Sequence, residues 1–364
     1  MSDLSNKKIL AFIGSYADSK DPGLYVCHYD VNNGGLDKLD QAAGLQNPTF
    51  LAVNEATSKL YAITEGMDSN NQRCGAVAAY DIDRNSGKLT LLNKENTVPA
   101  PTCHITLDHS GQCAIVSSYH GGMIGLSPLL NDGTIGRTSD IHYHKSMIAI
   151  EGTDAQRQAR AHSVFIDRLN RYAVACDLGL DRLFIYKLEA EEHRLTLHKE
   201  VPVAAGSGPR HFAFHPSLPY GYVISELNAT IIAYSYDGEQ GELAEIQTVS
   251  TLPDDYQGEN GCADIHISPD GKFLYGSNRG HDSIVVYAID QLTGKLTVVE
   301  YASTLGGHPR NFAISPDGQF LLVANRDSNN IVTFARDEKS GKLTPTGSVL
   351  TVSKPVCIKF AAIG

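Results

Sequence analysis

Short hydrophobic runs, separated by turn residues and polar loops, repeat along the whole 364-residue chain. In each copy, a first run leads through an Asp-Gly type turn to a second, a polar loop leads to a third, and a Gly-Lys-Leu turn leads to a fourth. The clearest copies cover residues 208–246, 263–299 and 308–347, and weaker copies begin near Pro48, Pro101 and Ala159. A unit of roughly 50 residues with four strands is typical of a β-propeller blade.

The two ends of the chain together supply one further copy of the pattern. Residues 354–361 match only the first strand of the unit, and residues 9–16, 24–29 and 36–41 match the other three. Pairing of the two ends would complete a seventh blade, close the ring and leave no long exposed sheet edge. We therefore predict an all-β, seven-bladed β-propeller with four antiparallel strands per blade. Residues 1–364 form one domain in this prediction, because each blade buries its faces only against its neighbours.

Composition argues against several classes of partner. The formal net charge is −11 and no basic stripe is present, which argues against a nucleic-acid partner. No apolar run reaches the roughly 20 residues of a membrane helix, and the N-terminal residues lack a signal-peptide apolar region. Seven scattered cysteines without a CxxC pair favour free thiols and a cytoplasmic location.

The motifs of common cofactor and metal sites are missing from the sequence. No GxSxG, HExxH, Walker or strand-linked GxGxxG motif occurs, so serine-hydrolase and nucleotide-binding functions lack support. His142 and His144 resemble a metal-binding pair, but they have no third ligand nearby. We therefore expect neither a metal ion nor a cofactor.

Alignment of the repeats reveals two polar columns at one end of the strands. The first column starts the first strand of each unit and contains Phe50, Cys103, His162, His211, Asp264, Asn311 and Cys357. The second column ends the next strand and contains Tyr16, Glu65, Tyr119, Asp177, Glu226, Arg279 and Arg326. In an antiparallel pair the start of one strand lies beside the end of the next, so both columns converge at one mouth of the channel. Converging charges in a concave site make this mouth the candidate active site.

Charges at the rim of a propeller can also pair across neighbouring blades and serve only the fold. Arg310 and Arg326 belong to dipeptides that recur in other repeats, as consensus residues do, which favours structural pairing for both. The same interpretation is favoured for Glu65 and Asp177.

Several stretches of the chain resemble the lactonase family of seven-bladed propellers, in particular its bacterial cycloisomerase-type 6-phosphogluconolactonases. The resemblance covers essentially the whole chain and is most specific at residues 161–168, 176–187, 206–216, 222–227 and 263–271. Related fungal carboxy-muconate lactonising enzymes draw their active site from a His, two Arg and a Glu. The resemblance places these catalytic roles on His162, Arg210, Glu226 and Arg279, which all belong to the two columns or directly precede them.

One segment departs from the family pattern. Many relatives carry Pro-His-Ala-His-Ser where this chain has Ala-Arg-Ala-His-Ser at residues 159–163, so Arg160 replaces the first histidine. An additional arginine at this place suits an anionic substrate. Residues 151–158 resemble the family's long loop, which would cover the mouth of the channel.

The resemblance implies hydrolysis of a sugar lactone, foremost of 6-phosphogluconolactone to 6-phosphogluconate in the pentose phosphate pathway. His162 or Glu226 would act as the base, and the two arginines would bind phosphate or stabilise the oxyanion. The expected substrate-binding residues are His211, Asp264, Arg160, Tyr119 and Arg326.

Two other functions stay open on the sequence. A lactonising cycloisomerase, or a hydrolase of another lactone, needs the same acid–base group and the same arginines. A propeller that binds a ligand or a protein without catalysis is also compatible, because fold alone does not define function. The expected partner is a small anionic lactone, with neither nucleic acid nor membrane, and the oligomeric state is left open.

Overall fold

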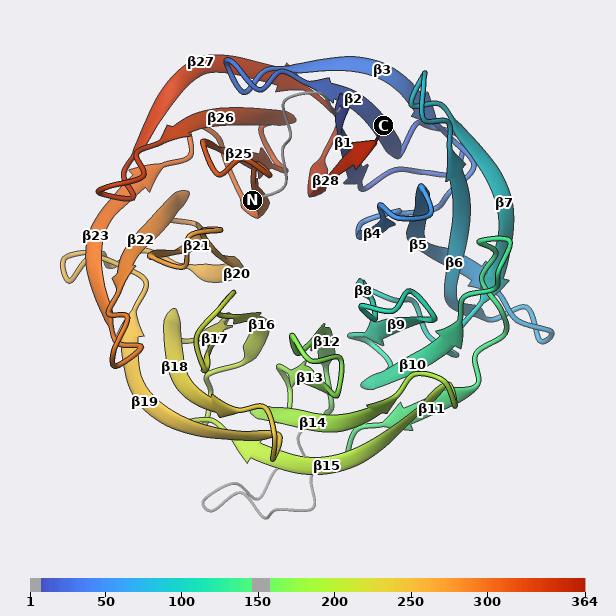
Figure 1. Cartoon of the computed structure of the whole chain (residues 1–364), viewed down its shortest axis with the longest axis horizontal. Helices are drawn as coiled ribbons and strands as arrows, with labels where there is room; N and C mark the ends of the chain where they lie inside the picture. Colours follow the sequence, from blue (N-terminus) through green and yellow to red (C-terminus); the bar gives the residue numbers. More distant parts are fainter. Residues whose placement is uncertain (1–7, 146–157, 364) are drawn as a thin grey trace.

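The protein is a ring of seven small sheets around a central channel (Figure 1). The structure is a computed structural model that describes residues 8–145 and 158–363. Within these residues 28 strands form seven four-stranded antiparallel sheets, which confirms the predicted propeller. Of the loop predicted to cover the mouth, residues 151–157 lie outside the described residues.

Each sheet is one blade, numbered here from the N-terminus and written from the inner to the outer strand. Blade 1 contains β28 (Pro355–Ile363), β1 (Lys8–Ser15), β2 (Leu24–Tyr29) and β3 (Leu36–Ala42). Blade 2 contains β4 (Leu51–Asn54), β5 (Lys59–Met67), β6 (Arg73–Ile82) and β7 (Leu89–Asn96). Blade 3 contains β8 (His104–Leu107), β9 (Cys113–Ser118), β10 (Met123–Pro128) and β11 (Asp140–Tyr143). Blade 4 contains β12 (Ala161–Ile166), β13 (Tyr172–Asp177), β14 (Arg182–Glu189) and β15 (Arg194–Pro202).

The remaining three blades follow the same plan. Blade 5 contains β16 (Pro209–Phe214), β17 (Tyr220–Ser225), β18 (Thr230–Asp237) and β19 (Glu242–Ser250). Blade 6 contains β20 (Gly261–Ile267), β21 (Phe273–Arg279), β22 (Ser283–Ile289) and β23 (Leu296–Ser303). Blade 7 contains β24 (Pro309–Ile314), β25 (Phe320–Asn325), β26 (Asn330–Arg336) and β27 (Leu343–Thr351).

Blade 1 closes the ring with strands from both ends of the chain, as the sequence predicts. β28 pairs antiparallel with β1 from Lys8 opposite Ile363 to Ser15 opposite Pro355. The C-terminal strand is thus the inner strand of a blade whose other three strands are N-terminal (Figure 1). This pairing leaves no open edge between the first and last parts of the chain.

Glycine turns in blades 6 and 7 lock each of these blades against its neighbour. Gly341, between β26 and β27, has φ +74°, and a Cβ there would lie 2.3 Å from Phe273 of blade 6. The hydroxyl of Tyr275 in the same neighbouring strand donates to the Gly341 carbonyl at 2.9 Å. Gly294 of blade 6 repeats the arrangement against Tyr220 and Tyr222 of blade 5. Only glycine combines this left-handed backbone with such a close aromatic neighbour, which explains why the turn recurs in the sequence.

The closing strand contributes buried apolar side chains to the contact between two blades, and this generates a prediction for stability. Ile358 is 1% exposed and lies in one apolar cluster with Ile13 of blade 1 and Leu322 of blade 7. We expect Ile358→Ala to lower the free energy of unfolding by about 2–5 kcal/mol, because it leaves a cavity between two blades. Urea unfolding measures this loss.

The matched control for this variant is Val349→Ala on the outer strand of blade 7. Val349 is 56% exposed, so its truncation should change the free energy of unfolding by no more than about 0.5 kcal/mol. If both variants lose the same small amount, β28 does not close the ring as described.

Candidate active site

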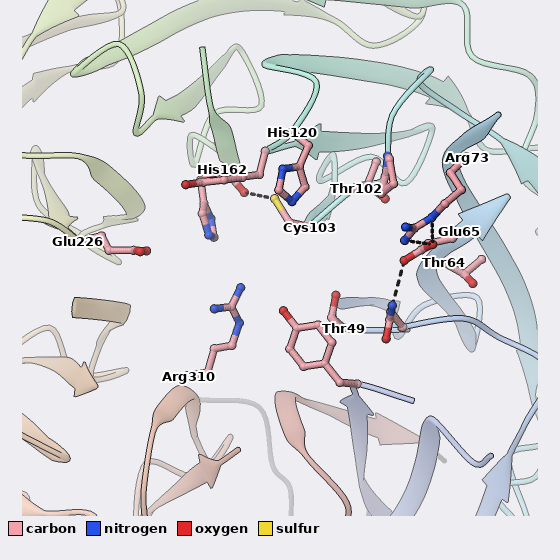
Figure 2. A pocket seen from close by; sticks show the side chains of 14 residues that line it. Thr49, Thr64, Glu65, Arg73, Thr102, Cys103, His120, His162, Glu226 and Arg310 are labelled. Carbon is pink, nitrogen blue, oxygen red and sulfur yellow. Dashed lines mark hydrogen bonds and ion pairs between the residues drawn. The ribbon is translucent and has the colours of Figure 1, made fainter. Parts of the chain in front are cut away.

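A pocket of about 640 Å³ opens at one mouth of the channel (Figure 2). Its walls come from every blade except blade 6, at the starts of inner strands and the ends of the strands beside them. The lining residues are Tyr16, Asn47, Thr49, Thr64, Glu65, Arg73, Pro101, Thr102, Cys103, Tyr119, His120, His162, Glu226 and Arg310. The volume suits a small ligand such as a sugar derivative.

A β-bulge at the start of the inner strand presents side chains to this mouth. In blades 4, 5 and 7 the pairing with the next strand skips one residue, which is His162, Arg210 or Arg310. A bulged residue is left out of the ladder, and its side chain takes a new direction. The three bulges therefore place one imidazole and two guanidinium groups at equivalent positions around the mouth.

The backbone that enters these strands is unusual as well. Asn47 and His308 have φ values of 51° and 59°, although each directly precedes a proline. The left-handed region is uncommon for residues other than glycine, and such conformations gather at functional sites. Asn47 itself lines the pocket.

The structure corrects the alignment behind the first polar column. His162 aligns with Arg210 and Arg310 at the mouth, whereas the sequence alignment placed it beside His211 and Asn311. A separate, buried layer lies one residue further along each inner strand and contains Phe50, His104, Ser163, His211, Asp264, Asn311 and Cys357. The alignment was wrong by one residue in blades 3 and 4, because a bulge does not alter the hydrophobic pattern used to align the repeats.

Glu226 joins two of the predicted catalytic arginines. It follows β17, and its Oε2 lies 2.9 Å from Arg279 Nη2 and 2.9 Å from Arg210 Nε. The N–H of Arg210 Nε does not point at this oxygen, so that contact is an ion pair without a hydrogen bond. Arg279 also donates to the carbonyls of Gly261 at 2.9 Å and Cys262 at 2.6 Å. Arg279 thus directs Nε and Nη2 within the protein, and Arg210 directs Nη1 to the carbonyl of Ala263.

The charged groups around Glu226 shift one another's pKa values. Burial raises the pKa of Glu226, but Arg210, Arg279 and Arg310 together outweigh it and hold the pKa below the ordinary value. Burial lowers the pKa of Arg210 to about 9, and the positive charges of Arg310 and Arg279 add to that shift. Glu226 is therefore ionised at neutral pH, and both paired arginines stay positively charged.

His162, the other predicted base, also lines the pocket. It is 4% exposed, and its ring meets those of His211 and Tyr119 edge-on, with centroid distances of 5.2 and 5.9 Å. Burial, and next the charge of Arg210, lowers the pKa of His162 well below the ordinary value. Its Nδ1 is buried and has no hydrogen-bond partner in the described part of the chain. A neutral imidazole of this kind can accept a proton from water.

His211 and Asp264 lie in the buried layer beneath the pocket and are not part of its wall. His211 Nδ1 is 2.8 Å from Asp264 Oδ1, and Asp264 Oδ2 is 3.0 Å from His266 Nε2 and accepts from Asn311 at 2.5 Å. Burial lowers the pKa of His211 to about 4. Burial raises the pKa of Asp264, but His266 and His211 outweigh it, and the pKa lies well below the ordinary value. This network forms a rigid polar floor.

The other predicted substrate-binding residues lie at different distances from the pocket. Tyr119 lines it, and the Arg160 guanidinium lies 5.0 Å from the centroid of the Tyr119 ring. Arg160 also donates to Gln158 at 2.8 Å. Arg326 is paired with Asp327 at 2.6 Å in a neighbouring depression that shares two residues with the pocket.

Sequence reasoning missed Arg73, which lies on the wall of the pocket that faces His162 and Glu226 (Figure 2). There Arg73 Nε donates to Glu65 Oε2 at 2.8 Å, and Asn47 Nδ2 donates to Glu65 Oε1 at 2.9 Å. Arg73 begins β6, a strand that the two columns did not include. The signal for it was an acid and an arginine that flank the same hairpin turn.

No cluster of three or more His, Cys, Asp or Glu side chains in the described ranges is arranged to hold a metal ion. No helix among residues 8–145 and 158–363 is long and apolar enough to cross a membrane.

The seven-bladed ring and the mixed charges at its mouth place this chain in a known class of β-propeller proteins. The chain belongs to the family described as lactonase, 7-bladed beta-propeller, whose model matches residues 10–360.

Individual relatives align with most of the chain. A 6-phosphogluconolactonase of Bacillus subtilis is 38% identical over 97% of this chain and 98% of its own length. Another from Formosa agariphila is 37% identical over 83% of this chain and 85% of its own. The solved structure of a periplasmic gluconolactonase from Pseudomonas aeruginosa superposes with a TM-score of 0.88 at 30% identity, covering 98% of this chain and 99% of that one.

The buried layer generates a prediction for the dependence of stability on pH. Burial, and next the neighbouring His211, lowers the pKa of His104 well below its ordinary value. Between about pH 6.5 and 5 the unfolded chain therefore binds a proton at this histidine and the folded protein does not, so stability falls as the pH falls. We expect His104→Gln to reduce that slope by up to about 1.4 kcal/mol per pH unit, as measured by urea unfolding at several pH values.

The exposed His198 provides the control. His198→Gln should leave the slope unchanged, because it replaces an exposed side chain outside the buried layer. An unchanged slope in His104→Gln would mean that His104 takes up a proton within the folded protein.

Proposed function

We propose that this protein hydrolyses a sugar lactone, foremost 6-phosphogluconolactone, to the open-chain acid 6-phosphogluconate. The observation that carries the proposal is the neutral imidazole of His162 in one pocket with an ionised Glu226 and two lining guanidinium groups. Relatives that align with 97% and 83% of the chain carry the name 6-phosphogluconolactonase, which supports the same substrate.

His162 is proposed as the acid–base group of the reaction. It takes a proton from water as the water oxygen bonds to the lactone carbonyl carbon, and it returns that proton to the ring oxygen when the ring C–O bond breaks. A lowered pKa makes the neutral imidazole a weaker base but makes its protonated form a stronger acid toward the leaving oxygen. The buried site therefore favours the second of these two proton transfers.

Glu226, Arg210 and Arg279 are proposed to act as one unit. The carboxylate is held between two guanidinium groups, which makes it a weaker candidate for the base than His162. The unit places positive potential beside the reacting carbonyl, and such preorganised charge stabilises the oxyanion that develops there. Glu226 orients this charge, since its Oε2 contacts both arginines.

The remaining predicted site residues receive supporting roles in this proposal. His211 and Asp264 would hold the ring of His162 from below, because His211 contacts it and is itself fixed by Asp264. Tyr119 would contact the sugar, with Arg160 stacked against its ring. Arg326 would act at most from the neighbouring depression.

We also propose a cytoplasmic location. All seven cysteines lie in the described residues and none forms a disulfide. Burial raises the pKa of Cys176 and that of Cys262 to about 12, which keeps both as thiols. Free buried thiols suit a reducing compartment. The net charge of −11 supports a small-molecule partner over nucleic acid.

A direct assay tests the proposed activity. Freshly prepared 6-phosphogluconolactone and glucono-δ-lactone are offered separately, and the spontaneous hydrolysis of each is subtracted. We expect the protein to accelerate hydrolysis of the phosphorylated lactone at nanomolar to micromolar enzyme concentrations. A rate equal to the spontaneous one for both lactones would refute the proposal.

The role of His162 generates a prediction for rate and pH. His162→Asn should lower kcat by about 10²–10⁴-fold at unchanged folding, because the proton acceptor is gone. A base works when deprotonated, and the pKa of His162 is lowered, so wild-type kcat/KM should stay level from pH 8 down to the ordinary imidazole range and fall only below it. Steady-state kinetics between pH 4.5 and 8.5 measure both effects.

Two further variants are compared with His162→Asn in the same experiment. His198→Asn changes an exposed histidine outside the pocket and should leave kcat unchanged. Glu226→Gln should reduce kcat by a smaller factor than His162→Asn and keep the acid limb of the wild-type profile. If Glu226→Gln abolishes that limb and His162→Asn retains it, Glu226 is the base.

A further inference from the structure

Arg310 differs from every other arginine near the pocket. It lines the pocket and is half-buried, yet it forms no ion pair and no hydrogen bond within the described residues. Its nearest recorded partner is the Tyr16 ring, whose centroid lies 5.8 Å from the guanidinium carbon. Arg73 is paired with Glu65, and Arg326 is paired with Asp327. Arg310 is thus a cation of the mouth with which no described side chain pairs directly.

The surroundings of Arg310 carry an excess of positive charge. Three guanidinium groups, Arg210, Arg279 and Arg310, share this side of the mouth, whereas two carboxylates, Glu226 and the buried Asp264, act on them. The charge of Arg310 acts on this whole group, since it contributes to the lowered pKa values of Arg210, Arg279 and Glu226. Unbalanced like charges in a half-buried pocket are unfavourable for the empty protein, and a dianionic ligand would offset them.

The opposite wall offers different chemistry. Arg73 is already neutralised there by Glu65, and Asn47, Thr49 and Thr64 add amide and hydroxyl groups. A carboxylate would repel a phosphate, but it readily accepts hydrogen bonds from hydroxyl groups. This wall suits the hydroxyl groups of a sugar, and the side of Arg310 suits its anionic group.

We propose that Arg310 binds the phosphate group of the substrate and thereby selects phosphorylated over unphosphorylated lactones. This inference rests on the proposed function for the identity of the anion. The bulge of β24 aims the guanidinium into the pocket toward His162 (Figure 2). A planar guanidinium donates two parallel hydrogen bonds to a phosphate, which fixes its orientation as well as its position. The lactone carbonyl would then extend across the mouth to His162.

Substitution of Arg310 tests the proposal through a ratio of substrates. Arg310→Gln should lower kcat/KM for 6-phosphogluconolactone by about 10- to 100-fold, mostly through KM, since one charged hydrogen-bonding partner of the phosphate is lost. For glucono-δ-lactone, which has no phosphate, the same variant should change kcat/KM by less than about threefold, because no charged contact is removed. Arg310→Lys should fall between the wild type and Arg310→Gln, because lysine keeps the charge and loses the fork.

The control is Arg137→Gln, which removes an exposed arginine outside the pocket and should alter neither rate. An equal loss for both lactones would overturn the proposal and place Arg310 at the reacting carbonyl. Unchanged kinetics for both lactones would overturn it as well.

A binding measurement separates this inference from the proposed activity. Calorimetric titration with 6-phosphogluconate, and with inorganic phosphate as a smaller probe, requires no turnover. Weaker binding of both probes to Arg310→Gln than to wild type supports the anion site, even if neither lactone is hydrolysed and the proposed activity fails. Equal binding by the two proteins overturns the inference whatever the kinetics show.

Discussion

The site depends on one backbone constraint, the extra residue at the start of an inner strand. In blades 4, 5 and 7 this bulge turns one side chain out of the ladder and toward the mouth, while the next residue points into the buried layer. A regular strand would alternate its side chains between the two faces of the blade and could not direct both neighbours toward the axis. The polar mouth and the polar floor therefore come from consecutive residues, as with Arg210 and His211.

The architecture could be predicted from the sequence because its determinants are local and repeated. Hydrophobic runs, Asp-Gly turns and the Gly-Lys-Leu turn define each blade, and the incomplete copies at the two ends identify the closure. The site was harder, since it depends on register to a single residue. His162 was correctly placed at the mouth, but its structural equivalents are Arg210 and Arg310, because the bulge leaves the apolar pattern unchanged.

Pairing between side chains is the second property that the sequence could not supply. Arg310 and Arg326 both looked like repeat consensus residues, yet Arg326 is bound to Asp327, and Arg310 has no such partner in the described chain. Arg73 was overlooked because it begins a third strand, whereas its pairing with Glu65 brings it to the pocket. Which charge is balanced depends on three-dimensional neighbours, and no repeat alignment contains that information.

The buried layer under the pocket also determines the route by which a ligand enters and leaves the site. Its members are at most 7% exposed, and the rings of Phe50 from blade 2 and His211 from blade 5 meet across the axis at a centroid distance of 6.0 Å. The channel is therefore plugged at this level, and the pocket is blind-ended. A ligand therefore enters and leaves through the same opening. A reaction product must dissociate through it before the next substrate molecule can bind, so product and substrate compete for the mouth.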